Sequence, residues 1–339
     1  MNLRLAIGVV VVVAALAPVV PALAQSSSTL DAVRSRGAVR CGVSTGLAGF
    51  ALPDKQGVYS GLDVDACRAV AAAVFGDAGR VAYVPLSAVQ RFTALQTGEV
   101  DLLARNASWT LSRNAALGLD FVVTNFYDGQ GFMVPKASGV TRAAELSGAS
   151  ICVQPGTLTE QNLADWFRAR NLKYTPVVIE QLDQVTTAYL AGRCDAITSD
   201  QSQLVAIRST APNAAAHIIL LDIISKEPLS VAVRSGEPGW ANIVRWSVFA
   251  MIEAEELGLS AQNIADRTSE PDPAIQRFVG ASGDLGKMLG LDNKWASNIV
   301  GQVGNYTESY ERNLLPLGIE RGVNRLWKDG GILIAPPIR

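Results

Sequence analysis

The chain has 339 residues, of which 49% are hydrophobic and 18% are charged, and its formal net charge at pH 7 is −2. This near-neutral balance excludes the large basic surface that a nucleic acid or an anionic membrane would select. The length exceeds one ordinary domain, so the sequence predicts two globular domains with sizeable cores.

The first 24 residues have the features of a secretory signal peptide. Arg4 supplies a positive charge, an apolar run follows from residue 5 to 17, and Ala22-x-Ala24 offers the small residues that signal peptidase needs. The apolar run is too short for a comfortable membrane span. We therefore predict cleavage after Ala24 and a secreted protein that starts at Gln25. Cys41 lies too far from this point to be a lipidated first residue, so we expect no membrane anchor.

Two stretches of the chain predict the same order of elements. Strand patterns at residues 39–43, 81–84 and 100–104 alternate with helical patterns at 62–75 and 89–97. From residue 150 the order returns, with strands at 151–153, 176–179 and 194–197 and helices at 158–170 and 184–191. Strands that alternate with helices in this way are typical of a doubly wound, mostly parallel sheet.

The two stretches also share a short sequence. Ala94-x-x-x-Gly98-x-x-Asp101 matches Ala188-x-x-x-Gly192-x-x-Asp195, with a glycine where the helix should end and an aspartate where the next strand should start. Because this short sequence falls at the same position in both halves, we do not attribute the match to chance. We expect an α/β protein of two doubly wound lobes with a cleft between them.

The cysteines fit this arrangement. The chain has four, and a secreted protein meets an oxidising compartment, so two disulfides are expected. We predict that Cys41 pairs with Cys67 and Cys152 with Cys194, because each pair joins adjacent elements of one βαβ layer. No spacing of Cys and His suits a metal.

Polar residues follow the predicted strands, where ligands of doubly wound sheets bind. Asn106 in the first lobe and Asp200 in the second each lie five residues after the repeated aspartate, so we expect them to face each other across the cleft. Arg113 falls in the first turn of a predicted helix, where its charge opposes the helix dipole.

This placement of Arg113 suggests that it binds an anion, with the hydroxyls of Ser108 and Thr110 as further donors. The alternative is a surface arginine beside an ordinary Ser/Thr cap. Thr157-x-x-Glu160 is a capping box, which also leaves a helix N-terminus that can receive an anion, although capping alone would explain it. Asp200 would be the carboxylate suited to an ammonium group. Together these residues predict a receptor for a zwitterion.

The sequence offers few candidate catalytic residues. The single histidine, His217, lies between a Pro-Asn turn and an apolar strand, where a structural role is the usual one. Gly42-x-Ser44-x-Gly46 matches a nucleophile elbow, but a loop rather than a helix follows it. We expect no enzyme activity, no cofactor and no metal.

At these residues the chain resembles the periplasmic solute-binding proteins of polar amino-acid ABC importers, and most closely the general L-amino-acid-binding type. The resemblance rests on Gly61-Leu-Asp63-Val-Asp65, on Ser108-x-Thr110-x-x-Arg113 and on Asp200-Gln201. It implies that Ser108, Arg113 and Thr157 hold an α-carboxylate and that Asp200 holds an α-ammonium. Leu47 stands where many members carry an aromatic wall, so Phe50 and Trp109 become candidates for that wall. We expect changes at Leu47, Phe50 or Arg91 to alter the preference among ligands.

The resemblance also implies a type II periplasmic binding protein-like architecture with a two-strand hinge. Lobe 1 would contain residues 25–128 and 228–339, and lobe 2 residues 129–227. A monomer in the periplasm would close around a free L-amino acid and present it to the membrane permease of an ABC importer.

Two other functions would use the same fold. A periplasmic lyase or murein-cleaving enzyme would need Asp200 or Glu160 as its acid or base. An adaptor that reports the ligand to a chemoreceptor would use the same binding residues. The sequence does not decide which amino-acid side chains are preferred.

Overall fold

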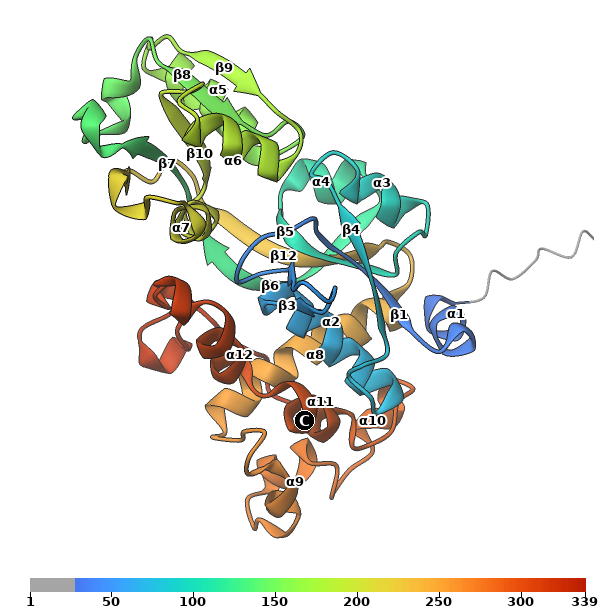
Figure 1. Cartoon of the computed structure of the whole chain (residues 1–339). Coiled ribbons are helices and arrows are strands. Elements are labelled where there is room, and N and C mark those ends of the chain that lie inside the picture. Colours follow the sequence, from blue (N-terminus) through green and yellow to red (C-terminus); the bar gives the residue numbers. More distant parts are fainter. Residues whose placement is uncertain (1–27) are drawn as a thin grey trace, which may run out of the picture.

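A computed structural model describes residues 28–339 and shows two α/β lobes, each built on a five-stranded sheet (Figure 1). The predicted signal peptide lies outside the described residues. In order across the sheet, the first lobe contains β4 (Val81–Leu86), β1 (Val39–Ser44), β5 (Leu102–Ser108), β12 (Glu227–Arg234) and β6 (Leu119–Asp128). The second lobe contains β11 (His217–Ile219), β7 (Gln130–Pro135), β10 (Ala196–Asp200), β8 (Ser150–Val153) and β9 (Thr175–Val178). A small hairpin joins β2 (Leu52–Pro53) and β3 (Tyr59–Ser60).

Helices cover these sheets. The α-helices are α1 (Thr29–Arg36), α2 (Leu62–Phe75), α3 (Arg91–Gln96), α4 (Leu111–Ala116), α5 (Leu158–Ala169), α6 (Leu182–Leu190), α7 (Gln201–Thr210), α8 (Pro238–Glu256), α9 (Pro273–Phe278), α10 (Leu285–Met288), α11 (Trp295–Val303) and α12 (Tyr306–Asn313). The 3₁₀ turns are η1 (Lys136–Ser138), η2 (Ala143–Leu146), η3 (Ala214–Ala216), η4 (Ile264–Ser269), η5 (Leu315–Leu317), η6 (Gly322–Asn324) and η7 (Trp327–Asp329). In the part of the chain from residue 28 onward, no helix has both the length and the apolar character needed to cross a membrane.

The predicted order of strands and helices is confirmed in both lobes, and α2 has the predicted bounds. The predicted ends of the third strands were wrong, because β5 continues to Ser108 and β10 to Asp200. The reason is a partner that the sequence pattern did not reveal. β5 pairs antiparallel with β12, and β10 pairs antiparallel with β7, so both sheets are mixed and the polar residues remain within the ladder.

The repeated sequence has the same role in both lobes. Gly98 and Gly192 follow the ends of α3 and α6 with φ values of 74–76°, in the left-handed region that favours glycine. The Asp101 carboxylate accepts a hydrogen bond of 2.7 Å from the backbone N–H of Arg40, next to Cys41 on β1. The Asp195 carboxylate accepts one of 2.7 Å from the N–H of Ser150 on β8. Each aspartate therefore fastens the start of the third strand to the first strand.

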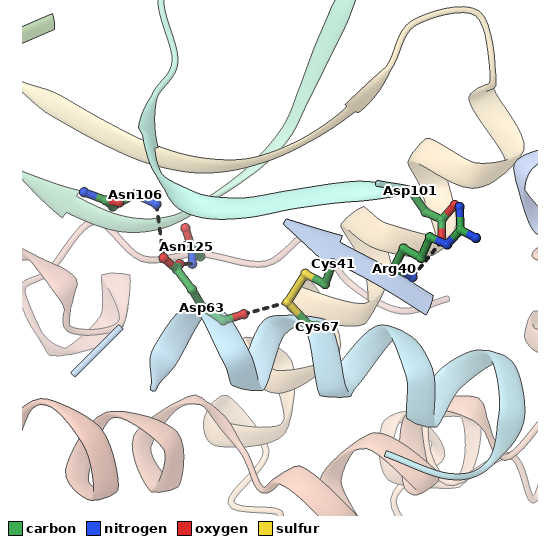
Figure 2. The surroundings of a disulfide bond; sticks show 7 residues. All are labelled: Arg40, Cys41, Asp63, Cys67, Asp101, Asn106 and Asn125. Carbon is green, nitrogen blue, oxygen red and sulfur yellow. Dashed lines mark hydrogen bonds between the residues drawn. A yellow bond between two sulfur atoms is a disulfide. The ribbon is translucent and has the colours of Figure 1, made fainter. Parts of the chain in front are cut away.

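Both predicted disulfides are present. Cys41 on β1 is bonded to Cys67 on α2, with their Cα atoms 6.1 Å apart (Figure 2). Cys152 on β8 is bonded to Cys194, which lies just before β10, with a Cα separation of 5.7 Å. Each bond lies within one lobe, so no disulfide joins the two lobes in the part of the chain that the structure describes.

The chain crosses between the sheets in two places. β6 ends at Asp128 and β7 begins at Gln130, so the first crossing falls at Gly129. The chain returns at Glu227, which is paired with Asp128 in the ladder of β12 and β6. Both crossing segments run between the two sheets (Figure 1).

Gly61, at the N-cap of α2, provides a test of how closely the start of this helix packs against the backbone at Phe50. Its φ is 137°, and an added Cβ would lie 2.0 Å from the carbonyl oxygen of Phe50. We expect Gly61→Ala to lower the free energy of unfolding by roughly 3 kcal/mol or more, because backbone strain and a backbone clash add. Urea denaturation measures this loss. Gly57→Ala is the matched control, since Gly57 has a φ of 82° with no atom within 4 Å of the added Cβ. Equal losses in the two variants would contradict the packing described.

Candidate functional site

A small polar cavity lies between the lobes. Its walls come from the ends of strands and the starts of helices in both lobes, which is where doubly wound sheets bind ligands. The lining residues are Arg91, Arg105, Asn106 and Ser108 from lobe 1 and Gln154, Thr157, Leu158, Thr159, Ser199, Asp200 and Gln203 from lobe 2. The cavity has a volume of about 20 Å³, close to the minimum that holds a water molecule. The lobes must therefore move apart before a larger molecule can enter.

The lobe 1 side of the cavity carries two buried guanidinium groups. Arg91 and Arg105 are each only 3% exposed. Arg105 donates to the carbonyl of Leu86 at 3.0 Å and to Asn106 Oδ1 at 2.8 Å. Arg91 lies over the Phe92 ring, and its Nε has no hydrogen-bond partner among the described residues. Burial lowers the pKa of Arg105 to about 10 and that of Arg91 well below its ordinary value. Both groups have donor capacity to offer an anion.

The lobe 2 side presents a carboxylate. Asp200 is 6% exposed and ends β10. It occupies the N-cap position of α7 but makes no capping bond there. Burial, and then the charges of Asp128 and Glu227, raise the pKa of the Asp200 carboxyl well above its ordinary value. A cation placed beside Asp200 would stabilise the charged form of its carboxyl group.

Asn106 and Asp200 line the same cavity, as the repeat predicted. Asn106 has a φ of 31°, which is unusual for a residue with a side chain. Asp63 at the start of α2 holds it there, because its carboxylate accepts from the Asn106 N–H at 3.1 Å and from Asn125 at 2.9 Å (Figure 2). The Asn106 side chain reaches Gln203 of α7 at 3.4 Å, so a bond crosses the cleft at this point.

The predicted group of Ser108, Thr110 and Arg113 is only partly assembled around the cavity. Ser108 lines it, but its hydroxyl donates to Glu227, so its single proton is already used. Thr110 caps α4 by accepting from the N–H of Arg113 at 3.2 Å. The Arg113 guanidinium donates to the Ser108 carbonyl at 2.9 Å and lies over Phe92, outside the cavity wall. Its charge still interacts with Glu227 and Asp200.

Thr157 is the N-cap of α5 and also lines the cavity. Its hydroxyl accepts from the Glu160 N–H at 3.1 Å and donates to the carbonyl of Gln154 at 2.7 Å. The predicted capping box was wrong in its second bond. The Glu160 carboxylate accepts from Gly156, one residue before the cap, because the turn places that N–H within 3.0 Å.

The apolar candidates are placed apart from the polar cavity. Phe50 is 1% exposed and packs edge-on against Phe126 at 5.3 Å, so it belongs to the core of lobe 1. Trp109 is 44% exposed and stacks on Phe121 at 6.3 Å. Leu47 instead lines a second, outer pocket of about 560 Å³, with the loop after β1 on one side and α6 and α7 on the other. Phe50 is therefore a packing residue, and Leu47 is the apolar candidate that faces a pocket between the lobes.

Several residues of the site were not predicted. Arg105 could have been noticed, because a charged residue directly after the apolar Leu102-Leu103-Ala104 is unusual. Gln203 lies one helical turn after Asp200, which places it on the same side of α7. Glu227 gave no local signal, since its position depends on the return of the chain from lobe 2. Within residues 28–339, no group of three or more His, Cys, Asp or Glu side chains has an arrangement that could hold a metal ion.

The buried carboxylates predict a pH dependence of stability. Burial raises the pKa of the Asp128 carboxyl from 3.8 to about 6, although Ser202 and Gly129 donate to it. Between these pH values the folded state keeps a proton that the unfolded state has released, so stability falls as the pH rises. We expect Asp128→Asn to flatten this fall between about pH 4 and pH 6.5, as measured by urea denaturation. The exposed Asp77 provides a control, because Asp77→Asn should keep the wild-type slope. An unchanged slope for Asp128→Asn would contradict the raised pKa of this carboxyl.

Comparison with known proteins places this architecture in a family. The model of bacterial extracellular solute-binding proteins, family 3, matches residues 39–263. The general L-amino acid-binding periplasmic protein AapJ of Rhizobium johnstonii is 54% identical over 94% of this chain and 95% of its own length. The glutamate/glutamine/aspartate/asparagine-binding protein BztA of Rhodobacter capsulatus is 52% identical over 93% of this chain and 95% of its own length.

A solved structure agrees with these relatives. The periplasmic binding protein of an ABC transporter from Brucella ovis, with glutathione bound, is 49% identical and superposes with a TM-score of 0.90. The superposition covers 92% of this chain and 100% of the other. The chain belongs to family 3 of the bacterial extracellular solute-binding proteins.

Proposed function

We propose that the protein captures free L-amino acids in the cleft between its lobes and delivers them to the permease of an ABC importer. The observation that carries this proposal is the cavity itself, in which buried guanidinium groups of lobe 1 lie opposite the buried carboxylate of Asp200 in lobe 2. AapJ and BztA align with almost the whole chain, and the amino acids in their names support the same ligand class.

An α-amino acid fits this distribution of charge. Its carboxylate would bind on the lobe 1 side, where Arg91, Arg105 and the nearby Arg113 lie. Its ammonium would lie beside Asp200. Charge-assisted hydrogen bonds contribute roughly 1.5 to 3 kcal/mol each, so three or four are enough for micromolar affinity, about −8.2 kcal/mol, after the cost of ordering.

The lobes would close on the ligand as rigid bodies. We assign residues 25–128 and 228–339 to lobe 1 and residues 129–227 to lobe 2, with the crossings at Gly129 and Glu227 as the hinge. Contacts across the cleft, such as the hydrogen bond of 3.0 Å from Ser87 to Glu180, would form on closure. A ligand that touches both lobes binds the closed form better and shifts the population toward it.

The protein is a binding protein and not an enzyme, as are the relatives described above. Its family is extracellular, and its relatives are periplasmic. We propose that it reaches the periplasm through the signal peptide cleaved after Ala24 and acts there as a monomer. Stimulation of the reconstituted permease and ATPase by the loaded protein would separate transport from a role as a chemoreceptor adaptor.

Asp200 provides the sharpest test of the amino-acid proposal. Asp200→Asn keeps the shape of the side chain but removes the charge that would pair with the ammonium. We expect affinity for the best ligand of a thermal-shift screen of the common L-amino acids to weaken by roughly 2 to 4 kcal/mol in calorimetry. Deaminated analogues should bind the wild type poorly and gain relative to the parent amino acid in the variant.

Asp165→Asn, on the exposed face of α5, is the matched control and should bind like the wild type. Normal binding of amino acids by Asp200→Asn would remove the ammonium site from Asp200. Turnover of a ligand that disappears in the same variant would favour a lyase or murein-cleaving enzyme instead.

A second ligand class is favoured by the outer pocket and by the relative with glutathione bound. Glutathione carries the free α-amino and α-carboxylate groups of a glutamyl residue, which would occupy the inner cavity. Its remaining two residues would extend along α7, because Gln203 lines the inner cavity and Ile207 the outer pocket. The volume of about 560 Å³ suits a group of that size.

Thr187→Trp tests this extension, because Thr187 is exposed on α6 and lines only the outer pocket of the two. We expect the tryptophan to weaken glutathione binding at least about tenfold while free glutamate keeps its affinity, since the added ring fills only the outer pocket. Gln184→Trp, one turn earlier on α6, is the control. Equal losses for glutathione and glutamate would mean that the outer pocket does not receive part of the ligand.

A further inference from the structure

Glu227 connects three parts of the molecule at the point where the chain returns from lobe 2. Its side chain is 1% exposed. One carboxylate oxygen accepts a hydrogen bond from the hydroxyl of Ser108 on β5 in lobe 1. The other accepts from Asn162 Nδ2 on α5 in lobe 2 at 2.8 Å and from the Ser225 hydroxyl at 2.5 Å.

The donors around Glu227 are neutral. None of the ion pairs found in residues 28–339 includes Glu227, although the charge of Arg113 interacts with it. It also lies beside two other carboxylates. Asp128 is its partner in the β12–β6 ladder, and the charge of Glu227 contributes to the raised pKa of Asp200. A buried carboxylate among like charges costs stability, so a functional reason for its position is expected.

The hydrogen bonds of Glu227 indicate why a carboxylate is buried at this position. Asp128 also bonds to lobe 2, through the N–H and hydroxyl of Ser202, but none of its hydrogen bonds within residues 28–339 reaches a residue that lines the cavity. Glu227 bonds at the same time to Ser108, which lines the cavity, and to Asn162, which moves with lobe 2. The bond to Asn162 on α5 depends on how the lobes are oriented. The bond to Ser108 lies within one sheet, because Glu227 is the hinge residue that begins β12 and Ser108 ends the neighbouring β5.

We infer that Glu227 is a positioning residue for ligand capture, whose carboxylate holds the Ser108 hydroxyl in a fixed orientation and ties it to Asn162 when the lobes close. The inference rests on the proposed function in one respect, namely that closure accompanies binding. Opening the cleft breaks the Asn162 bond, so Glu227 couples the orientation of a cavity residue to the orientation of the opposite lobe. The closed form is thereby favoured even before a ligand binds.

The test measures the distance between the lobes in the full mature protein. Nitroxide labels at Lys55→Cys and Gln184→Cys, both at exposed positions, report opening by double electron–electron resonance. We expect Asn162→Ala and Glu227→Gln each to move the ligand-free population toward longer distances and to weaken binding of the best amino-acid ligand about tenfold. Gln161→Ala, the exposed neighbour of Asn162 on α5, should leave both measurements unchanged.

The double variant separates coupling from a general loss of stability. If Glu227 and Asn162 act through one bond, Glu227→Gln with Asn162→Ala should be no more open than Glu227→Gln alone. Additive effects, or distances in Asn162→Ala equal to those in Gln161→Ala, would overturn the inference. Asn162→Ala keeps the test valid if Glu227→Gln fails to fold. Because the ligand-free distances require no amino acid, absence of binding by the wild type would overturn the proposed function without deciding the role of Glu227.

Discussion

Charges of opposite sign are buried on opposite sides of one cleft. The arrangement of the lobes depends on which groups compensate these charges. Arg91 and Arg105 are satisfied mainly by carbonyl and amide oxygens of lobe 1, while Asp200 is buried near Asp128 and Glu227. Burying charges without a close counter-ion is costly, because the interior solvates them poorly. A molecule with an anionic and a cationic end, placed between the two sets, would reduce both costs at once. A purely anionic or purely cationic ligand would reduce only one.

The internal repeat explains why the two lobes present such sets to the same place. In each lobe an aspartate at the start of the third strand, Asp101 or Asp195, is bonded to the first strand. This bond fixes the register of the parallel pair, and the polar residues five positions later then fall at the same end of each sheet. Asn106 and Asp200 line one cavity because the lobes face each other, and the chain crosses between the lobes at Gly129 and Glu227.

The sequence predicted what depends on local pattern and failed where distant segments meet. The bounds of α2, both disulfides and the position of Asn106 and Asp200 on one cavity follow from periodicity, cysteine positions and the repeat. The length of β5 depends on its pairing with β12, more than a hundred residues later, and no local pattern contains that information. Phe50 was misplaced for the same reason. Its burial depends on Phe126, a residue of β6 that the pattern did not connect with the loop after β1.

For the proposed amino-acid ligands, the distribution of polar groups would also explain how one site could suit different side chains. The inner cavity is lined almost entirely by groups that match the charged atoms common to all α-amino acids, and its wall contains a single aliphatic side chain, Leu158. The outer pocket, by contrast, is lined by threonines and aliphatic residues such as Leu47 and Ile207, with Asp183 as its charged residue. Short hydroxyl and methyl groups of this kind reject few side chains, because they leave no strongly solvated group unpaired. Affinity would thus come from the inner cavity, and the outer pocket would set how large a ligand the closed cleft accepts.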